Sequence, residues 1–199
     1  MKKPGMYLAL LLVLSLLVLP LATFAATAKA TVETEVGKIL EQLKDPAFKQ
    51  LAKEEQIEKI RSIINKVFNY TELSRRTLGR EWKKFSPEQQ QEFEQLFGKL
   101  LERSYADRVL AYTSEKIEFG KETELRKDKV EVESAIITTD NKSIPVHYRM
   151  VFKNDQWQVY DVVIEGISLV QNYRSQFREI LAKKSPEDLL ATLREKVNP

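Results

Sequence analysis

Few side chains in this sequence could do chemistry, and the most suggestive group is one aspartate with tyrosines close to it along the chain. Asp161 directly follows Tyr160, while Tyr148 and Tyr173 lie 13 and 12 positions away. An aspartate in an apolar interior has a raised pKa, which suits proton transfer. The sequence therefore allows a small α+β acid–base enzyme of the isomerase or dehydratase type. We favour the alternative that Asp161 has a structural role, hydrogen-bonded to Arg174 or to a backbone amide.

Other catalytic and metal-binding classes are disfavoured by residues that the sequence lacks. It contains no cysteine, which excludes disulfides, thiolate catalysis, Cys-ligated zinc and a lipid-modified N-terminus. No G-x-S-x-G string marks a serine nucleophile, and the six glycines stand too far apart for a phosphate-binding loop. The single histidine, His147, is predicted to be an exposed strand residue rather than a metal ligand. We therefore expect a protein that is not an enzyme, with no catalytic residue, no metal and no cofactor.

The balance of charge argues against a nucleic-acid partner. The chain has 32 Lys+Arg and 29 Asp+Glu, and removal of the two lysines near the N-terminus leaves 30 against 29. A nucleic-acid-binding protein needs a concentrated basic surface, which a near-neutral mixture of charges does not supply. The composition fits a protein that meets its partners through local patches, and we expect a monomer.

The N-terminus has the composition of a secretory signal peptide over residues 1–28. Two lysines precede the apolar run Met6–Leu21, and small residues follow it, as in a signal that is cleaved after Ala25 or Ala28. We slightly prefer Ala28. The alternative is an uncleaved membrane anchor, but the run is shorter than the roughly 20 residues that span a bilayer. Residues 29–199 then form one domain of ordinary size.

The first half of the mature chain has the periodicity of helices. Apolar residues recur at three- and four-residue steps over 32–43 and 57–68, and a short helix is predicted over 71–78. Asp45-Pro46 resembles a cap followed by proline at the first helical position. Gly79 is placed where glycine commonly ends a helix.

The strongest local pattern predicts a long helix over 86–112. Ser86 is its cap, Pro87 its first residue, and Gln89 completes a capping box. Apolar residues then follow on one face for about six turns.

The second half of the chain changes to alternating polar and apolar residues, which is typical of strands with one buried face. Four strands are predicted, at 116–125, 129–139, 143–152 and 156–164. Short turns such as Asn154-Asp155 make them an antiparallel meander. After a break at Gly166, helices are predicted over 167–177 and 185–197. The fold class is α+β: one domain with N-terminal helices, a curled four-stranded antiparallel sheet and C-terminal helices. From the sequence alone, a filled core and a hollow one look alike.

Three stretches of the chain resemble the MlaC family, which is also called the toluene-tolerance family. They combine L-G-R-x-W with the F-x-x-L-F-x-x-L-L-x-x-x-Y helix in 78–112, and W-x-V-Y-D-V-x-I-E-G-I-S-L-V with N-Y-R-S-Q-F in 144–181. The third stretch is S-P-E-D-L-L-A-T-L-R-E-K in 185–196. Each motif alone is common in proteins, but their combination in this order is specific to the family. The resemblance spans nearly the whole mature chain.

This resemblance implies a soluble periplasmic phospholipid carrier of Gram-negative bacteria. Such a protein is a cone-like domain that holds acyl chains in an apolar cavity between its sheet and helices, and it is an auxiliary component of an ABC transport system. It shuttles lipid between an outer-membrane lipoprotein complex and the substrate-binding ring of an inner-membrane ABC transporter, which maintains outer-membrane lipid asymmetry.

If the chain is such a carrier, apolar residues of the long helix, the sheet and the helix after Gly166 should line the lipid cavity. In that case Asn172, Arg174 and Gln176 lie nearer the surface. Arg174 is expected to hold Asp161 or Glu165, and the alternative is that it contacts a lipid phosphate. The expected lipid-binding residues are Phe93, Leu96, Phe97, Leu100, Val132, Ile136, Val146, Tyr148, Met150, Trp157, Val159, Ile164, Ile167, Val170, Tyr173 and Phe177.

Overall fold

The computed structural model describes residues 26–112 and 116–198, so the predicted signal peptide lies almost wholly outside the described residues. The helices are α1 (Ala28–Lys44), α2 (Pro46–Lys49), α3 (Lys53–Val67), α4 (Tyr70–Leu78), the 3₁₀ helix η1 (Gly79–Lys84), α5 (Pro87–Ala111), α6 (Leu169–Leu181) and α7 (Pro186–Val197). The strands are β1 (Lys116–Arg126), β2 (Lys129–Ile137), β3 (Ser143–Lys153), β4 (Gln156–Ile164) and β5 (Ile167–Ser168). The order of helices, sheet and helices confirms the predicted α+β class.

The strands form one antiparallel sheet in the order β1-β2-β3-β4-β5, which corrects the predicted number of four. The additional strand has only two residues, too few for alternation to be visible in the sequence. It exists because Glu165 and Gly166 both have positive φ, 50° and 81°, and so form a tight turn that folds Ile167 back onto Ile164. The predicted break at Gly166 is therefore a hairpin turn.

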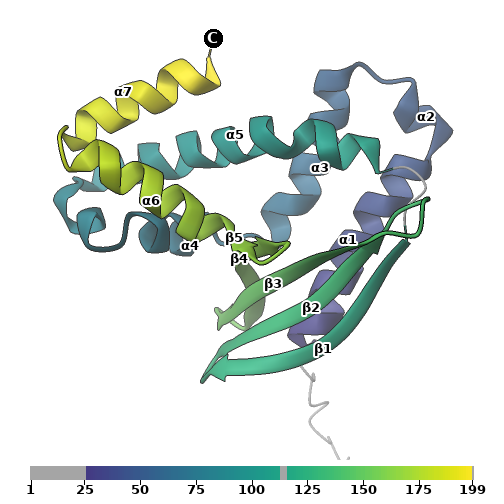
Figure 1. Cartoon of the computed structure of the whole chain (residues 1–199). Coiled ribbons are helices and arrows are strands. Elements are labelled where there is room, and N and C mark those ends of the chain that lie inside the picture. The colour runs from purple at the N-terminus through teal and green to yellow at the C-terminus, as the bar shows by residue number, and fades with distance from the viewer. Residues whose placement is uncertain (1–25, 113–115, 199) are drawn as a thin grey trace, which may run out of the picture.

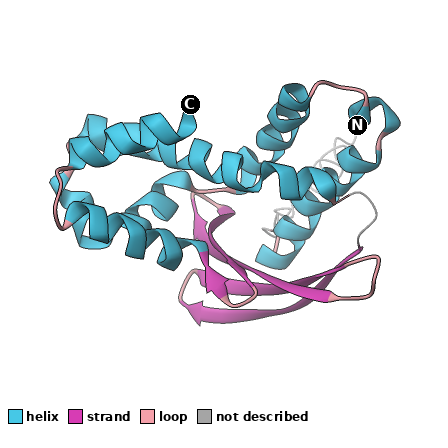
Figure 2. Cartoon of the chain, turned by 45° about the horizontal axis from the view of Figure 1, so that its top comes forward, coloured by secondary structure: helices cyan, strands magenta, loops and turns pink. Residues whose placement is uncertain are grey.

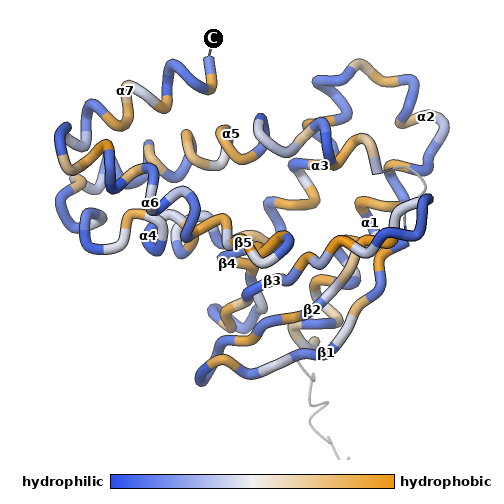
Figure 3. The backbone as a smooth tube through the Cα atoms, viewed as in Figure 1, coloured by the Kyte–Doolittle hydropathy of each residue, from blue (hydrophilic) through white to orange (hydrophobic). Residues whose placement is uncertain are grey.

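The helices cover one face of the curved, open sheet (Figures 1 and 2). The long helix α5 runs above the sheet, with α4, α6 and α7 packed around its N-terminal half and α1 and α3 near its C-terminal half. Hydrophobic and hydrophilic residues alternate along the central strands (Figure 3). In β2 this alternation is regular, since every second residue from Val130 to Ile136 is buried.

Several helices begin at the caps that the sequence predicts. Asp45 accepts a hydrogen bond from the backbone N–H of Ala47, with Pro46 as the first helical residue. Ser86 and Gln89 form the reciprocal capping box of α5. Ser185 caps α7 in the same way. These caps satisfy backbone donors that have no partner within the helix.

The end of the molecule at α4, α6 and α7 is solidly packed. Phe93 and Phe97 of α5 meet Phe177 and Tyr173 of α6, with ring centroids 5.1 to 5.7 Å apart across this contact and within α6. Phe93 and Phe97 are 0% exposed. This aromatic cluster fills the space between the helices and anchors the N-terminal half of α5.

Candidate functional site

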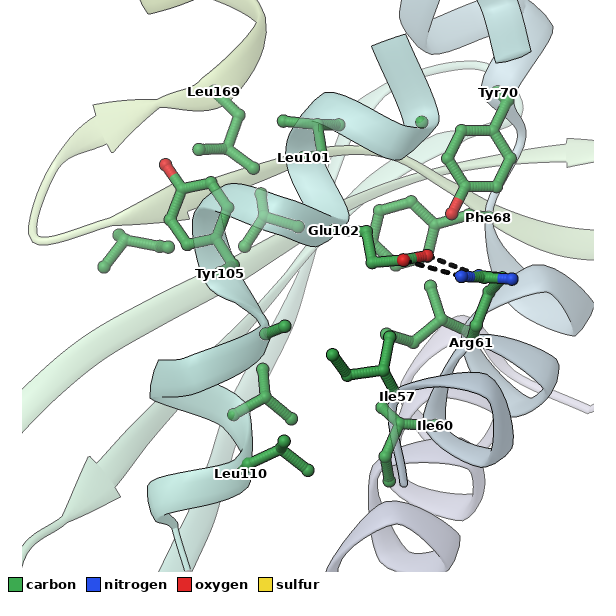
Figure 4. Close-up of a pocket in the computed structure, with 16 residues that line it drawn as sticks. Ile57, Ile60, Arg61, Phe68, Tyr70, Leu101, Glu102, Tyr105, Leu110 and Leu169 are labelled. Atoms are coloured by element: carbon green, nitrogen blue, oxygen red, sulfur yellow. Dashed lines mark hydrogen bonds and ion pairs between the residues drawn. The ribbon is translucent and has the colours of Figure 1, made fainter. Parts of the chain in front are cut away.

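A cavity of about 210 Å³, here called cavity 1, lies between α3 and α5 above β4 (Figure 4). The two helices face one another across it, and Leu169 at the start of α6 and Tyr70 at the start of α4 also line it. Gly98 lets the ring of Tyr70 approach α5, because a Cβ at this position would lie 3.3 Å from Tyr70 Cε1. The lining residues are Ile57, Ile60, Arg61, Ile64, Phe68, Tyr70, Gly98, Leu101, Glu102, Tyr105, Ala106, Val109, Leu110, Val162, Ile164 and Leu169.

A second cavity of about 190 Å³, cavity 2, lies between α1, the C-terminal end of α5 and the inner face of the sheet. Its helical wall comes from residues of α1 at three- and four-residue spacing, and its floor from alternate residues of the strands. The lining residues are Val36, Ile39, Leu40, Leu43, Tyr105, Arg108, Val109, Tyr112, Ile117, Ile136, Ile144, Val146, Tyr148 and Ile164.

The two cavities share a wall. Tyr105 and Val109, one turn apart on α5, line both of them, and so does Ile164 at the end of β4. Helix α5 therefore lies between the two apolar cavities, and these three side chains separate them.

Among the described residues, the charged side chains that line the cavities are Arg61 and Glu102 in cavity 1 and Arg108 in cavity 2. In cavity 1, Arg61 Nη2 lies 2.6 Å from Glu102 Oε1, and the guanidinium also pairs with Glu58. The Arg61–Glu102 pair spans α3 and α5 (Figure 4). Beside it, burial and the Glu102 carboxylate raise the pKa of Tyr70 to about 12. In cavity 2, Arg108 is the charged residue of the wall.

Tyr148 is the polar side chain on the floor of cavity 2. It is half-buried because its ring faces the cavity. Burial raises its pKa to about 12, while a hydrogen bond with Ser134 acts in the opposite direction. Its hydroxyl therefore stays protonated at neutral pH and is a weak polar element in an apolar surface.

These cavities are suited to bind an apolar ligand. An apolar protein cavity of about 150 Å³ is known to take up benzene, and each of these spaces is larger. Within residues 26–112 and 116–198 no group of three or more His, Asp or Glu side chains is arranged to hold a metal ion. None of the described helices is both long and apolar enough to cross a membrane.

A family model described as "MlaC protein" matches residues 33–195. The chain belongs to the MlaC family. The resemblance inferred from the sequence is thereby confirmed.

Two proteins that are similar to this chain carry names that describe a lipid ligand. The chain is 27% identical over 194 residues to the intermembrane phospholipid transport system binding protein MlaC of Haemophilus influenzae, covering 91% of each chain. It also matches the structure of a phospholipid-binding protein of Ralstonia solanacearum in complex with a phospholipid. That match has a TM-score of 0.79 and 26% identity and covers 86% of this chain and 97% of the other.

The structure places only some of the predicted lipid-binding residues at the cavities of this MlaC family member. Four of them line a cavity: Ile136, Val146, Tyr148 and Ile164. Ten are buried in the packed core: Phe93, Leu96, Phe97, Leu100, Val132, Met150, Val159, Val170, Tyr173 and Phe177. Trp157 is partly buried against that core.

Ile167 requires a correction, because it lies neither at a cavity nor in the core. Its side chain is 61% exposed on the edge strand β5. The prediction placed Ile167 at the start of the helix, on its apolar face. The helix instead begins at Leu169, with Ser168 as its cap.

Asp161 has the structural role that we favoured, although Arg174 is not its partner. It is 2% exposed and lines neither cavity. Its carboxylate accepts hydrogen bonds from Ser168 Oγ at 2.6 Å, the backbone N–H of Val170 at 3.0 Å and Arg149 Nη1 at 3.2 Å. Asp161 thus holds the N-terminus of α6 against β4, where the helix dipole favours a negative charge.

The expected contact of Arg174 with Asp161 or Glu165 is absent from the described hydrogen bonds and ion pairs. Arg174 Nε instead donates to the backbone carbonyl of Arg76 at 3.0 Å, in the last turn of α4. This bond ties α6 to α4. Asn172 and Gln176 are exposed, as predicted.

Most residues of the helical cavity wall are not among the predicted lipid-binding residues. The missed residues belong to the apolar stripes of α1 and α3 and to the C-terminal half of α5, all of which were recognised as buried faces. Such stripes show that a face is covered, and they do not show whether a void lies behind it. His147 is partly exposed, and its Nδ1 lies 3.6 Å from Glu131.

Proposed function

We propose that this protein is a periplasmic phospholipid carrier that holds acyl chains in cavities 1 and 2. It takes lipid from one membrane complex and delivers it to another, between an outer-membrane lipoprotein complex and an inner-membrane ABC transporter, and so maintains lipid asymmetry. The observation that carries the proposal is the pair of apolar cavities with a common wall, in a member of the MlaC family. The phospholipid named for both relatives supports it.

The energetics explain why such a carrier is needed. Two acyl chains of about fifteen methylenes each would lose roughly 24 kcal/mol on exposure to water, at about 0.8 kcal/mol for each methylene. This exceeds the practical limit of non-covalent affinity, roughly 18 to 21 kcal/mol. A lipid therefore cannot cross an aqueous compartment alone at a useful rate. Its carrier needs an apolar interior and no catalytic group.

We further propose that the signal peptide is cleaved after Ala25 rather than after Ala28. Thr27 caps α1 by accepting a hydrogen bond from the backbone N–H of Ala30 at 3.1 Å. Ala28 is 0% exposed at the first position of the helix. A cut after Ala28 would remove both residues, and loss of such a cap costs about 1 kcal/mol.

Lipid transfer between two vesicle populations tests the carrier function. Donor vesicles contain fluorescent phosphatidylglycerol, and acceptor vesicles are separated from them by a dialysis membrane that the protein crosses. We expect the purified protein to accelerate the appearance of label in the acceptors in proportion to its concentration, because each molecule carries lipid through water. Heat-denatured protein is the control. Transfer at the spontaneous rate would contradict the proposal.

A further inference from the structure

Arg108 stands where cavity 2 opens to solvent. It lies in the last turn of α5, is exposed, and lines the cavity together with apolar residues of α1 and the sheet. An exposed side chain in the wall of an otherwise apolar space marks its mouth. The guanidinium lies 5.8 Å from the centroid of the Tyr105 ring.

The charged cluster at the wall of cavity 1 has the opposite net charge. Arg61 is engaged there by two carboxylates, Glu102 and Glu58, so these three groups sum to one negative charge. Arg108 differs: no carboxylate among residues 26–112 and 116–198 lies within 4.0 Å of its guanidinium, and its neighbour Asp107 is paired with Lys53 at 2.6 Å. An anion is therefore favoured beside Arg108 and disfavoured beside Arg61.

The shared wall determines where the polar part of a two-chain lipid would lie. Tyr105 and Val109 line both cavities. If one acyl chain lies in each cavity, the glycerol that joins the chains is expected close to these shared residues. Arg108 follows Tyr105 by three positions, which places both side chains on neighbouring parts of one helix face. The phosphate attached to that glycerol comes within reach of the guanidinium.

We propose that Arg108 binds the phosphate of a phospholipid whose two acyl chains occupy cavities 1 and 2. The inference rests on the proposed function and adds to it a recognition site for the phosphodiester group. A guanidinium presents planar, permanently charged donors that match two phosphate oxygens at once. A lipid with the same acyl chains but no phosphate gains no binding free energy from Arg108.

A competition between two lipids tests the site. Purified protein is incubated with vesicles that contain equal amounts of dioleoyl phosphatidylglycerol and dioleoylglycerol, and the ratio of the two lipids bound is measured by native mass spectrometry. We expect Arg108→Gln to lower the ratio of phosphatidylglycerol to dioleoylglycerol about tenfold, because charge-assisted hydrogen bonds to the phosphate are lost. Arg108→Lys keeps the positive charge but cannot form the bidentate hydrogen bonds of a guanidinium, and should give an intermediate ratio.

The matched control is Arg103→Gln, an exposed arginine of the same helix that lines neither cavity. It should leave the ratio unchanged, which separates phosphate recognition from a general loss of positive charge. Because both lipids compete on the same molecules, a difference in stability between variants cancels from the ratio.

Three results would overturn the assignment. An unchanged ratio in Arg108→Gln, or an equal decrease in Arg103→Gln, would show that Arg108 does not recognise the phosphate. Binding of inorganic phosphate that depends on Arg108, without any change in the lipid ratio, would assign the residue to a free anion instead. The carrier function itself fails in a distinguishable way, since wild-type protein would then take up neither lipid.

Discussion

Replacement of Ala106 by tryptophan should remove most of the bound lipid while the protein remains folded. Ala106 is a small residue of α5 in the wall of cavity 1, which offers about 210 Å³. An indole at this position occupies space that an acyl chain would use. In a tightly packed core such a large side chain costs typically 1 to 3 kcal/mol in strain, and a pre-existing void lowers that cost. Bound lipid per protein molecule is measured after extraction, and folding by thermal denaturation.

The comparison with other tryptophan variants makes this result specific. Val36→Trp fills cavity 2 in the same way, and the double variant should bind no phospholipid. Arg103→Trp places an indole on the exposed side of α5 and should retain the wild-type amount. Full lipid occupancy in the folded double variant would mean that the lipid lies elsewhere.

Replacement of Asp161 by alanine should lower the free energy of unfolding by about 3 kcal/mol, because it removes a buried charge and leaves several donors without a partner. Ser168 Oγ, the backbone N–H of Val170 and Arg149 all donate to this carboxylate. Arg149 retains a second partner, since its Nε lies 2.8 Å from Glu131 Oε2. Urea denaturation of wild type and variant measures the difference.

Asp161→Asn and Ser168→Ala complete this test. The amide keeps the shape of the side chain and one acceptor oxygen, so we expect a smaller loss of stability than with alanine. Ser168→Ala removes one cap and should cost about 1 kcal/mol. Folded Asp161→Asn should still carry lipid, because Asp161 lines neither cavity. If Asp161→Ala were as stable as wild type, the junction between β4 and α6 would not depend on this carboxylate.

Much of the fold could be predicted because its determinants are local. Ser86, Pro87 and Gln89 define the start of α5 through a capping box that needs no tertiary partner. The strands follow from alternation, and the β3–β4 turn follows from Asn154-Asp155, which have φ values of 52° and 59°. In each case a short segment contains the whole physical reason for its structure.

The cavities could not be predicted, because they depend on what lies opposite each residue. Phe97 and Tyr105 lie a little over two turns apart on α5 and belong to the same apolar stripe. Phe97 meets Tyr173 and Phe177 and is enclosed by them, whereas Tyr105 faces two voids. Local periodicity encodes which face is buried, and only the arrangement of distant helices decides whether that face is packed.

The partner of Arg174 was mispredicted for a related reason. Its nearness in sequence to Asp161 and Glu165 suggested a charge pair, whereas the chain brings it to the end of α4, where it donates to the carbonyl of Arg76. Long side chains choose among partners that the tertiary structure supplies, and helix C-termini offer carbonyls that lack partners within the helix.

The most direct test of the lipid-carrier account is native mass spectrometry of the exported protein, purified without detergent, together with its mass after denaturation. The account predicts a complex whose excess mass is one phospholipid, released on denaturation, and a polypeptide that begins at Ala26. The contrary result is a protein that has the mass of the polypeptide alone and takes up no phospholipid from vesicles. It would contradict the account, because the two apolar cavities would then not bind lipid.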